Sequence, residues 1–136
     1  MIYKILGKPI ALKRPRTDFI RRRVYDCQRP EKDDAILQLR LQHKQKPAFD
    51  GPLNLTVTFF MLVPASSSLK KKLLLYNQPH IKAPDLSNLL KFVEDVIVEA
   101  QIITDDSKII SISAKKLYAE YPRTEFQITK EGCEKS

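Results

Sequence analysis

The most constraining feature of the sequence is a periodic run of apolar residues between positions 86 and 100. Apolar side chains recur three and four positions apart there, at Leu86, Leu89, Leu90, Val93, Val96, Ile97 and Ala100. This spacing places them along one stripe of an α-helix, which must be covered by a sheet or another helix. The chain is therefore expected to build a packed core around this helix.

The remaining elements predict the fold class. Apolar and polar residues alternate over one segment, as in a strand with one buried face, with the apolar ones at Leu53, Leu55, Val57, Phe59 and Met61. Further strands are expected over residues 2–6, 110–115 and 125–128, the last two as a hairpin. Further helices are expected over residues 30–46 and 68–76. We predict a single α+β (α/β) domain over residues 1–136, with a mixed sheet, helices packed on it, and a frayed tail over about 130–136.

Positive charge is concentrated in the first third of the chain. The formal net charge is +8. Residues 1–46 contain 13 basic and 5 acidic side chains, whereas residues 47–136 contain 11 of each. A basic stretch over about 11–30 reads as a loop or a hairpin tip. Such asymmetry favours a polyanionic partner, either nucleic acid or an anionic membrane surface, although a solvated basic face would look the same.

Several function classes have no support in the composition. No apolar run approaches the roughly 18 residues of a membrane helix. The two cysteines lie 106 positions apart without a CxxC motif, which favours neither a zinc site nor a disulfide framework and agrees with a reducing, cytoplasmic setting. With three glycines and two histidines, neither a phosphate-binding glycine loop nor a catalytic triad is indicated, so no small-molecule cofactor is expected.

Acidic residues flank the long helix. Asp85 precedes it, and Asp105 and Asp106 follow it after a short connection. Carboxylate clusters suit Mg²⁺ or Mn²⁺, which activate water and neutralise charge on a phosphodiester. Asp85 could equally be a helix N-cap, and the later pair a turn before a strand. Asp85 and Asp106 meet only if the next strand begins beside the start of the helix, and the sequence leaves this open.

Three further polar residues share one face of this helix. Ser87, Asn88 and Lys91 lie within one turn of each other, and Asp95 continues the face. A solvated lysine, paired with Asp95 at i, i+4, would explain Lys91 and Asp95 without any function.

The motif resembles that of the RusA family of Holliday junction resolvases. Its core here is Pro84-Asp85-Leu-Ser87-Asn88-Leu-x-Lys91, followed by Asp95 and the Asp105-Asp106 pair before a strand. Two further stretches agree: residues 7–16, similar to the family's first strand and basic loop, and residues 116–125, similar to its terminal hairpin. The resemblance covers most of the chain in order, while residues 20–80 contain no diagnostic motif.

The resemblance implies a homodimeric α/β endonuclease that cuts four-way DNA junctions with Mg²⁺ or Mn²⁺. Position by position, Asp85 and Asp106 would be metal ligands and Lys91 would act near the scissile phosphate. Asp105 would be a supporting acid at the metal. Asn88 and Asp95 would support the site. Phosphate contacts would come from the basic stretch, from Lys13, Arg14, Arg16, Arg21, Arg22 and Arg23.

One position departs from the family pattern. Ser87 stands where better-known members have a second aspartate, and a serine hydroxyl is a weaker, neutral ligand for a hard cation. Ser87 is at least as well explained as a helix-capping residue. The resemblance as a whole makes a metal-dependent junction endonuclease the leading hypothesis. The alternatives are a non-catalytic junction-binding protein on the same fold and a small basic RNA-binding protein.

Overall fold

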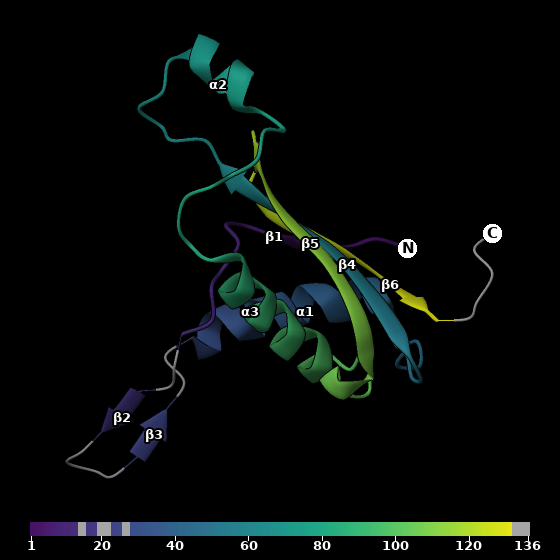
Figure 1. Ribbon diagram of the computed structural model, residues 1–136. Coiled ribbons are helices and arrows are strands. Elements are labelled where there is room, and N and C mark those ends of the chain that lie inside the picture. Colours follow the sequence, from purple (N-terminus) through teal and green to yellow (C-terminus); the bar gives the residue numbers. More distant parts are fainter. Residues whose placement is uncertain (14–15, 19–22, 26–27, 132–136) are drawn as a thin grey trace.

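A four-stranded mixed sheet in the order β1-β6-β4-β5 forms the centre of the structure, seen in the computed structural model (Figure 1). The structure describes residues 1–13, 16–18, 23–25 and 28–131. Strand β4 pairs parallel with β5 and antiparallel with β6, and β6 pairs antiparallel with β1. The strands of the sheet are β1 (Tyr3–Leu6), β4 (Leu53–Leu62), β5 (Ile109–Ala119) and β6 (Arg123–Lys130).

Strand β4 is central because its alternating residues need cover on one face. Leu53, Leu55, Val57 and Phe59 are each 1% exposed. The residues between them point to the opposite face, which helices α1 and α3 do not cover (Figure 1). The strand predicted from the alternation is thus confirmed, and so is the mixed sheet with helices packed on it.

Two helices, α1 (Arg29–His43) and α3 (Leu86–Glu99), cover the apolar face of the sheet (Figure 1). Helix α3 is the one predicted from the apolar stripe, and Leu89, Val96 and Ile97 are completely buried. Helix α1 begins with a proline in its first turn, where the missing amide hydrogen breaks no helical hydrogen bond. It ends earlier than the predicted residue 46, because Lys44 takes a left-handed conformation.

A third helix lies on an arm between β4 and α3. Helix α2 (Leu69–Leu75) begins after Ser68, whose hydroxyl accepts a hydrogen bond from the Lys71 amide at 3.2 Å. Ser68 is thus the N-cap of the helix expected over residues 68–76. Figure 1 shows α2 away from the two core helices. We refer to residues 64–84 as the α2 arm.

The predicted terminal hairpin is wrong. Strands β5 and β6 follow each other in sequence, but β4 lies between them in the sheet. Helix α3 returns the chain to the end of the sheet where β4 begins. Strand β5 therefore runs beside β4 and parallel to it over ten paired positions. Strand β6 then covers the other edge of β4, with Phe126 opposite Val57. A strand on each edge of β4 extends its apolar face in both directions. The burial gained in this way outweighs the local pairing of β5 with β6.

The basic stretch near the N-terminus forms a hairpin, one of its two expected forms. Strands β2 (Arg16–Asp18) and β3 (Arg23–Tyr25) pair antiparallel. The buried Gln28 joins the two ends of the hairpin: its Oε1 accepts from the Lys13 amide at 2.9 Å, and its Nε2 donates to the Ala11 carbonyl at 2.8 Å. We refer to β2 and β3, with Lys13 and Gln28 at their two ends, as the basic hairpin. The tail predicted to fray lies outside the described residues from position 132 onward.

No helix in the described part of the chain is long and apolar enough to cross a membrane.

The carboxylate of Asp50 ties the turn before β4 to the connection before β5. The Thr104 hydroxyl donates to Asp50 Oδ1 at 2.9 Å, and Lys108 Nζ lies 3.3 Å from the same oxygen. The Gly51 amide, followed by the Thr104 and Lys108 contacts, lowers the pKa of Asp50 below its usual 3.8. The folded state therefore gains stability above pH 3.8 and loses that gain as the pH falls through the lowered pKa.

We predict that Asp50→Asn lowers the melting temperature at pH 7 by about 1–3 °C, because the site is exposed and its charges are screened. The difference from wild type should shrink as the pH falls below about 4. Thermal unfolding followed by circular dichroism at neutral pH and at two acidic pH values checks this. Glu120→Gln, in the exposed turn after β5, is the control and should show no such pattern. A difference that grows at low pH would contradict the assignment.

Candidate active site

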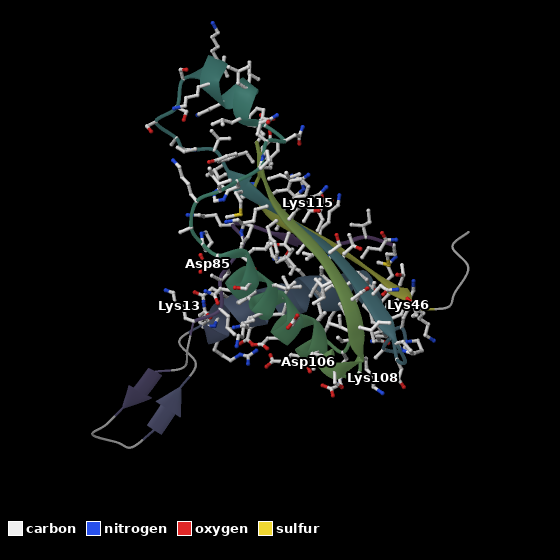
Figure 2. All side chains as sticks on the ribbon, in the orientation of Figure 1. Lys13, Lys46, Asp85, Asp106, Lys108 and Lys115 are labelled. Carbon is white, nitrogen blue, oxygen red and sulfur yellow. The ribbon has the colours of Figure 1, made fainter. Side chains whose placement is uncertain are left out.

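Asp85 lies at the N-cap position of α3 and is exposed (Figure 2). Its backbone is extended, with φ −68° and ψ 140°, and its carbonyl accepts from the Asn88 and Leu89 amides at 3.2 and 3.1 Å. Its carboxylate, however, makes no capping hydrogen bond. The capping explanation for the Asp85 side chain therefore does not hold, and neither does an N-cap role for Ser87, which is the second residue of the helix.

The polar residues after Asp85 lie on the first two turns of α3. Ser87 and Lys91 are exposed, and Asn88 is half-buried. The Asn88 carbonyl accepts a hydrogen bond from the Leu12 amide at 2.9 Å. The chain that leads into the basic hairpin is thus attached to α3 one turn from Asp85.

Asp95 does not pair with Lys91. Its carboxylate lies 3.5 Å from Lys32 Nζ of α1, and the Lys32 side chain is only 10% exposed. The i, i+4 explanation for Lys91 and Asp95 is therefore replaced by a contact between the two helices.

A shallow cavity of about 310 Å³ lies beside the last turns of α3. We call it the acidic hollow, since its polar lining consists of Glu94, Asp95, Glu99, Asp105 and Asp106. Two of these acids already have cationic partners on α1: Glu99 lies 2.6 Å from Arg29, and Asp95 pairs with Lys32. Burial, followed by the charges of Asp106 and Asp95, raises the pKa of Glu94 above its usual value.

The two aspartates of the predicted pair differ. The Ser107 hydroxyl donates to Asp105 Oδ2 at 2.7 Å, and this bond is the largest cause of the lowered pKa of Asp105. Asp106 begins the single 3₁₀ turn η1 (Asp106–Lys108) and is exposed. Both aspartates line the hollow, but it is the charge of Asp106 that helps to raise the pKa of Glu94.

Asp85 and Asp106 lie apart within the chain. Asp106 lies beside the C-terminal half of α3, whereas Asp85 precedes the helix (Figure 2). Ten residues separate Asp85 from Asp95 of the hollow, about 15 Å at 1.5 Å per residue. Strand β5 starts at the far end of α3, so the connection does not return to Asp85. Among the described residues, no three His, Cys, Asp or Glu side chains are grouped closely enough to hold a metal ion.

Two basic projections leave the body of the protein near the Asp85 end of α3 (Figure 1). One is the basic hairpin, with the exposed Lys13 at its root and Arg16 and Arg23 on its strands. The other predicted DNA-contacting residues lie outside the described residues: Arg14, Arg21 and Arg22. The second projection is the α2 arm, which contains four lysines and no acid.

Sequence reasoning missed some of these residues. Lys70 and Lys71 of α2 are exposed and were not assigned to any surface, although the run of three lysines after three serines marks the segment. Glu94 and Glu99 were missed because their placement beside Asp106 depends on where β5 begins. No motif in the sequence signals this.

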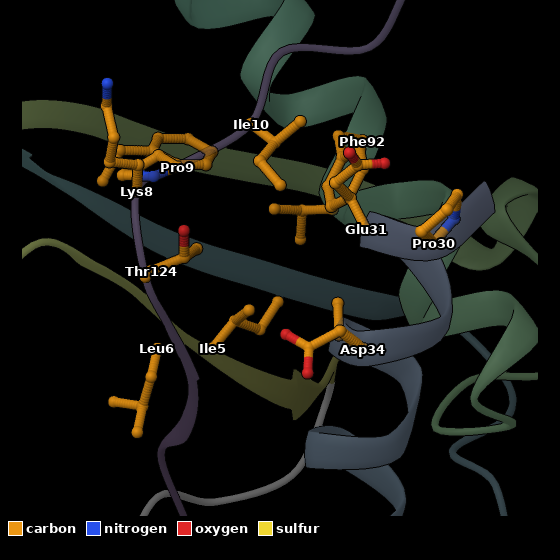
Figure 3. A pocket seen from close by; sticks show the side chains of 14 residues that line it. Ile5, Leu6, Lys8, Pro9, Ile10, Pro30, Glu31, Asp34, Phe92 and Thr124 are labelled. Carbon is orange, nitrogen blue, oxygen red and sulfur yellow. The ribbon is translucent and has the colours of Figure 1, made fainter. Parts of the chain in front are cut away.

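A larger cavity, of about 450 Å³, lies between β1, α1 and α3 (Figure 3). Its walls are mostly apolar, including Ile5, Ile10 and Phe92, with the carboxylates of Glu31 and Asp34 at one side. None of the predicted site residues that the structure describes lines it.

Comparison with known proteins agrees with the motif around Asp85. The family model described as endodeoxyribonuclease RusA matches residues 7–129. The chain is 30% identical over 138 aligned positions to the uncharacterized protein YqaN of Bacillus subtilis (strain 168), with 93% of each protein covered. It is 35% identical over 91 positions to the crossover junction endodeoxyribonuclease rusA of Lactococcus phage r1t, covering 65% of this chain and 64% of the phage protein. The chain belongs to the RusA endodeoxyribonuclease family.

Proposed function

We propose that this chain is a divalent-metal-dependent endodeoxyribonuclease that resolves four-way DNA junctions in recombination and repair. The observation that carries the proposal is Asp85: an exposed carboxylate without a capping bond, at the end of α3 where the basic hairpin is attached. Membership of the RusA family supports the nuclease activity. The junction substrate is suggested by the name of the phage relative.

Asp85 and Asp106 are the proposed ligands of Mg²⁺ or Mn²⁺, with Ser87 and Asp105 beside them. These ions bind carboxylate and hydroxyl oxygens, so the chemistry of the donors fits, although the donors lie apart within a single chain. When bound, the ion would neutralise charge on the phosphodiester and activate water for in-line attack. Asp85 itself would contribute a fixed negative oxygen donor that no capping bond competes for.

Lys91 is the third proposed catalytic residue, beside Asp85 and Asp106, while Asn88 and Asp95 have supporting roles. Lys91 would present its exposed ammonium to the scissile phosphate. Asn88 would fix the root of the basic hairpin through its carbonyl, and Asp95 would fix α3 against α1 through Lys32. Neither Asn88 nor Asp95 needs to touch the substrate for this.

The proposed homodimer would explain how Asp85 and Asp106 can bind one ion although they lie apart within one chain. An ion ligated by both Asp85 and Asp106 needs them from two different chains, since about 15 Å of helix lies between their positions in one chain. A two-fold dimer exchanges such contacts symmetrically and would form two equivalent sites. Two sites on one dimer suit paired cuts in opposing strands of a junction.

Ser87 favours a second candidate function. A hydroxyl in place of the family's second aspartate removes one negative charge next to Asp85, which weakens metal binding. A protein that keeps the fold and the basic surface would then bind junctions without cutting them. Cleavage, rather than binding, separates this candidate from the enzyme.

The two basic projections support binding through phosphates. The basic hairpin and the α2 arm leave from different sides of the Asp85 end of α3 (Figure 1). The arm ends directly at Asp85, and its exposed Lys70 and Lys71 have no acidic neighbour within it. DNA held by both projections would pass the N-terminal end of α3.

For cleavage, we predict that the wild type nicks a labelled four-way junction in Mg²⁺ or Mn²⁺ and not in EDTA. Asp85→Asn should reduce the rate about a hundredfold or more, because it removes a charged ligand. Binding measured by gel shift in EDTA should remain within about threefold of wild type. Asp34→Asn, an exposed acid on α1, is the matched control and should keep full activity.

Ser87→Asp distinguishes the two candidate functions in the same assay. In an active enzyme, it should lower the metal concentration needed for half-maximal cleavage. Cleavage by Ser87→Asp alone would identify the wild type as a junction-binding protein. Tighter binding to an RNA hairpin than to the junction, with no cleavage by any variant, would contradict both candidates.

The shared site predicts complementation between two inactive variants. If each ion uses Asp85 of one chain and Asp106 of the other, a heterodimer of Asp85→Asn and Asp106→Asn contains one intact site. After mixing and subunit exchange, about half of the dimers are mixed, so about a quarter of the wild-type nicking should return. Nicking gels of the mixture and of each variant alone measure this. No recovery in a mixture proven to contain heterodimers would show that the acids act within one chain.

The salt dependence of binding tests the α2 arm. Removing one lysine–phosphate interaction should reduce the slope of log K against log salt by about 0.9, so Lys70→Ala with Lys71→Ala should reduce it by up to about 1.8. Lys44→Ala with Lys46→Ala, an equal change of charge at the far end of the molecule, is the control (Figure 2). Equal slopes for the two double variants would remove the arm from the binding surface.

A further inference from the structure

Lys116 lies on the face of β5 that the helices cover. It pairs with Phe59 of β4, whose side chain is 1% exposed and belongs to the core. Lys115, the preceding residue, points to the uncovered face and is exposed (Figure 2). The Lys116 side chain is half-buried, and an ammonium group that is partly withdrawn from water needs hydrogen-bond acceptors to offset the lost hydration.

The acceptors of Lys116 are two backbone carbonyls just before Asp85. Its Nζ donates to the Lys82 carbonyl at 2.6 Å and to the Pro84 carbonyl at 2.7 Å. Hydrogen bonds from a charged donor are shorter and stronger than neutral ones. The Pro84 carbonyl belongs to the peptide unit that leads into Asp85, so the ammonium contacts the residue directly preceding the proposed metal ligand.

Backbone bonds attach the preceding part of the same segment to β5. The His80 amide donates to the Lys116 carbonyl at 3.0 Å, and the Tyr118 amide donates to the Gln78 carbonyl at 3.0 Å. The Lys116 side chain extends this attachment from residue 80 to residue 84. Its charge also acts at His80, where it is the second cause, after burial, of a lowered pKa.

Packing contributes little to holding residues 81–83. Ile81 is 87% exposed, and Lys82 and Ala83 are exposed as well. The polar contacts of Lys116 therefore account for much of the order in this segment.

We propose that Lys116 is a positioning residue: its ammonium fixes the backbone before α3 and thereby sets where the Asp85 carboxylate stands. This inference rests on the proposed function of Asp85. Lys116 does not touch the substrate. It acts through the Lys82 and Pro84 carbonyls, and an apolar side chain of similar length, such as methionine, cannot replace it because it offers no donor.

The test compares Lys116→Met with Lys115→Met, which removes the same charge from the neighbouring position on the opposite face. In Lys116→Met, amide hydrogen exchange of residues 81–88 should become faster, while exchange in β4 and β6 stays as in wild type. The turnover number for junction cleavage should fall about tenfold or more, with the KM for the junction within about twofold. The half-saturating Mn²⁺ concentration should rise. Lys115→Met should change none of these.

Lys116→Arg is the second variant, in case Lys116→Met does not fold. A guanidinium keeps the charge and the donors. Amide exchange at residues 81–88 of Lys116→Arg should therefore be closer to the wild-type rate than in folded Lys116→Met. If Lys116→Met does not fold, the exchange rate of the unfolded protein is the comparison. Unchanged exchange at residues 81–88 in folded Lys116→Met would overturn the proposal. A wild type that does not cleave contradicts the proposed nuclease function instead, and the exchange measurement still tests the role of Lys116.

Discussion

The packing of α3 on the apolar face of the sheet is the interaction on which the rest of the structure depends. The buried stripe of α3, with Leu89, Val96 and Ile97 fully covered, fixes the helix on the apolar face of the sheet. The helix direction then places Asp85 at one end and the connection containing Asp106 at the other. Because β5 starts from this second end, it runs parallel to β4. The positions of all the candidate acids follow from this one contact.

This arrangement divides the proposed chemistry between two places. The Asp85 end of α3 has Lys91 on the next turns, the basic hairpin attached through Asn88, and the α2 arm leading directly into it. The acidic hollow has Asp106 and Glu94, while two of its other acids, Glu99 and Asp95, pair with Arg29 and Lys32. A dimer that brings one end of α3 to the opposite end of a second α3 would unite them. In the proposed mechanism, the homodimer would therefore complete the catalytic site, beyond its role in binding symmetric DNA.

The sequence could predict elements whose signal is local. The period of α3, the alternation of β4 and the serine cap of α2 are each contained in a short window, and all three are found in the structure. The order of the strands could not be predicted in this way, because the position of β6 depends on the edge of β4 that β5 leaves open. The separation of Asp85 from Asp106 depends on the same choice. The role of Lys116 could not be predicted either, because it depends on the Lys82 and Pro84 carbonyls, which a different segment of the chain brings to β5.

Anomalous diffraction at the manganese edge, from crystals grown with Mn²⁺ and a four-way junction, tests the shared metal site most directly. We expect an anomalous peak about 2.1 Å from a carboxylate oxygen of Asp85, with Asp106 of a second chain on the same ion. A peak confined to the acidic hollow, with Asp85 away from both metal and DNA, would contradict it.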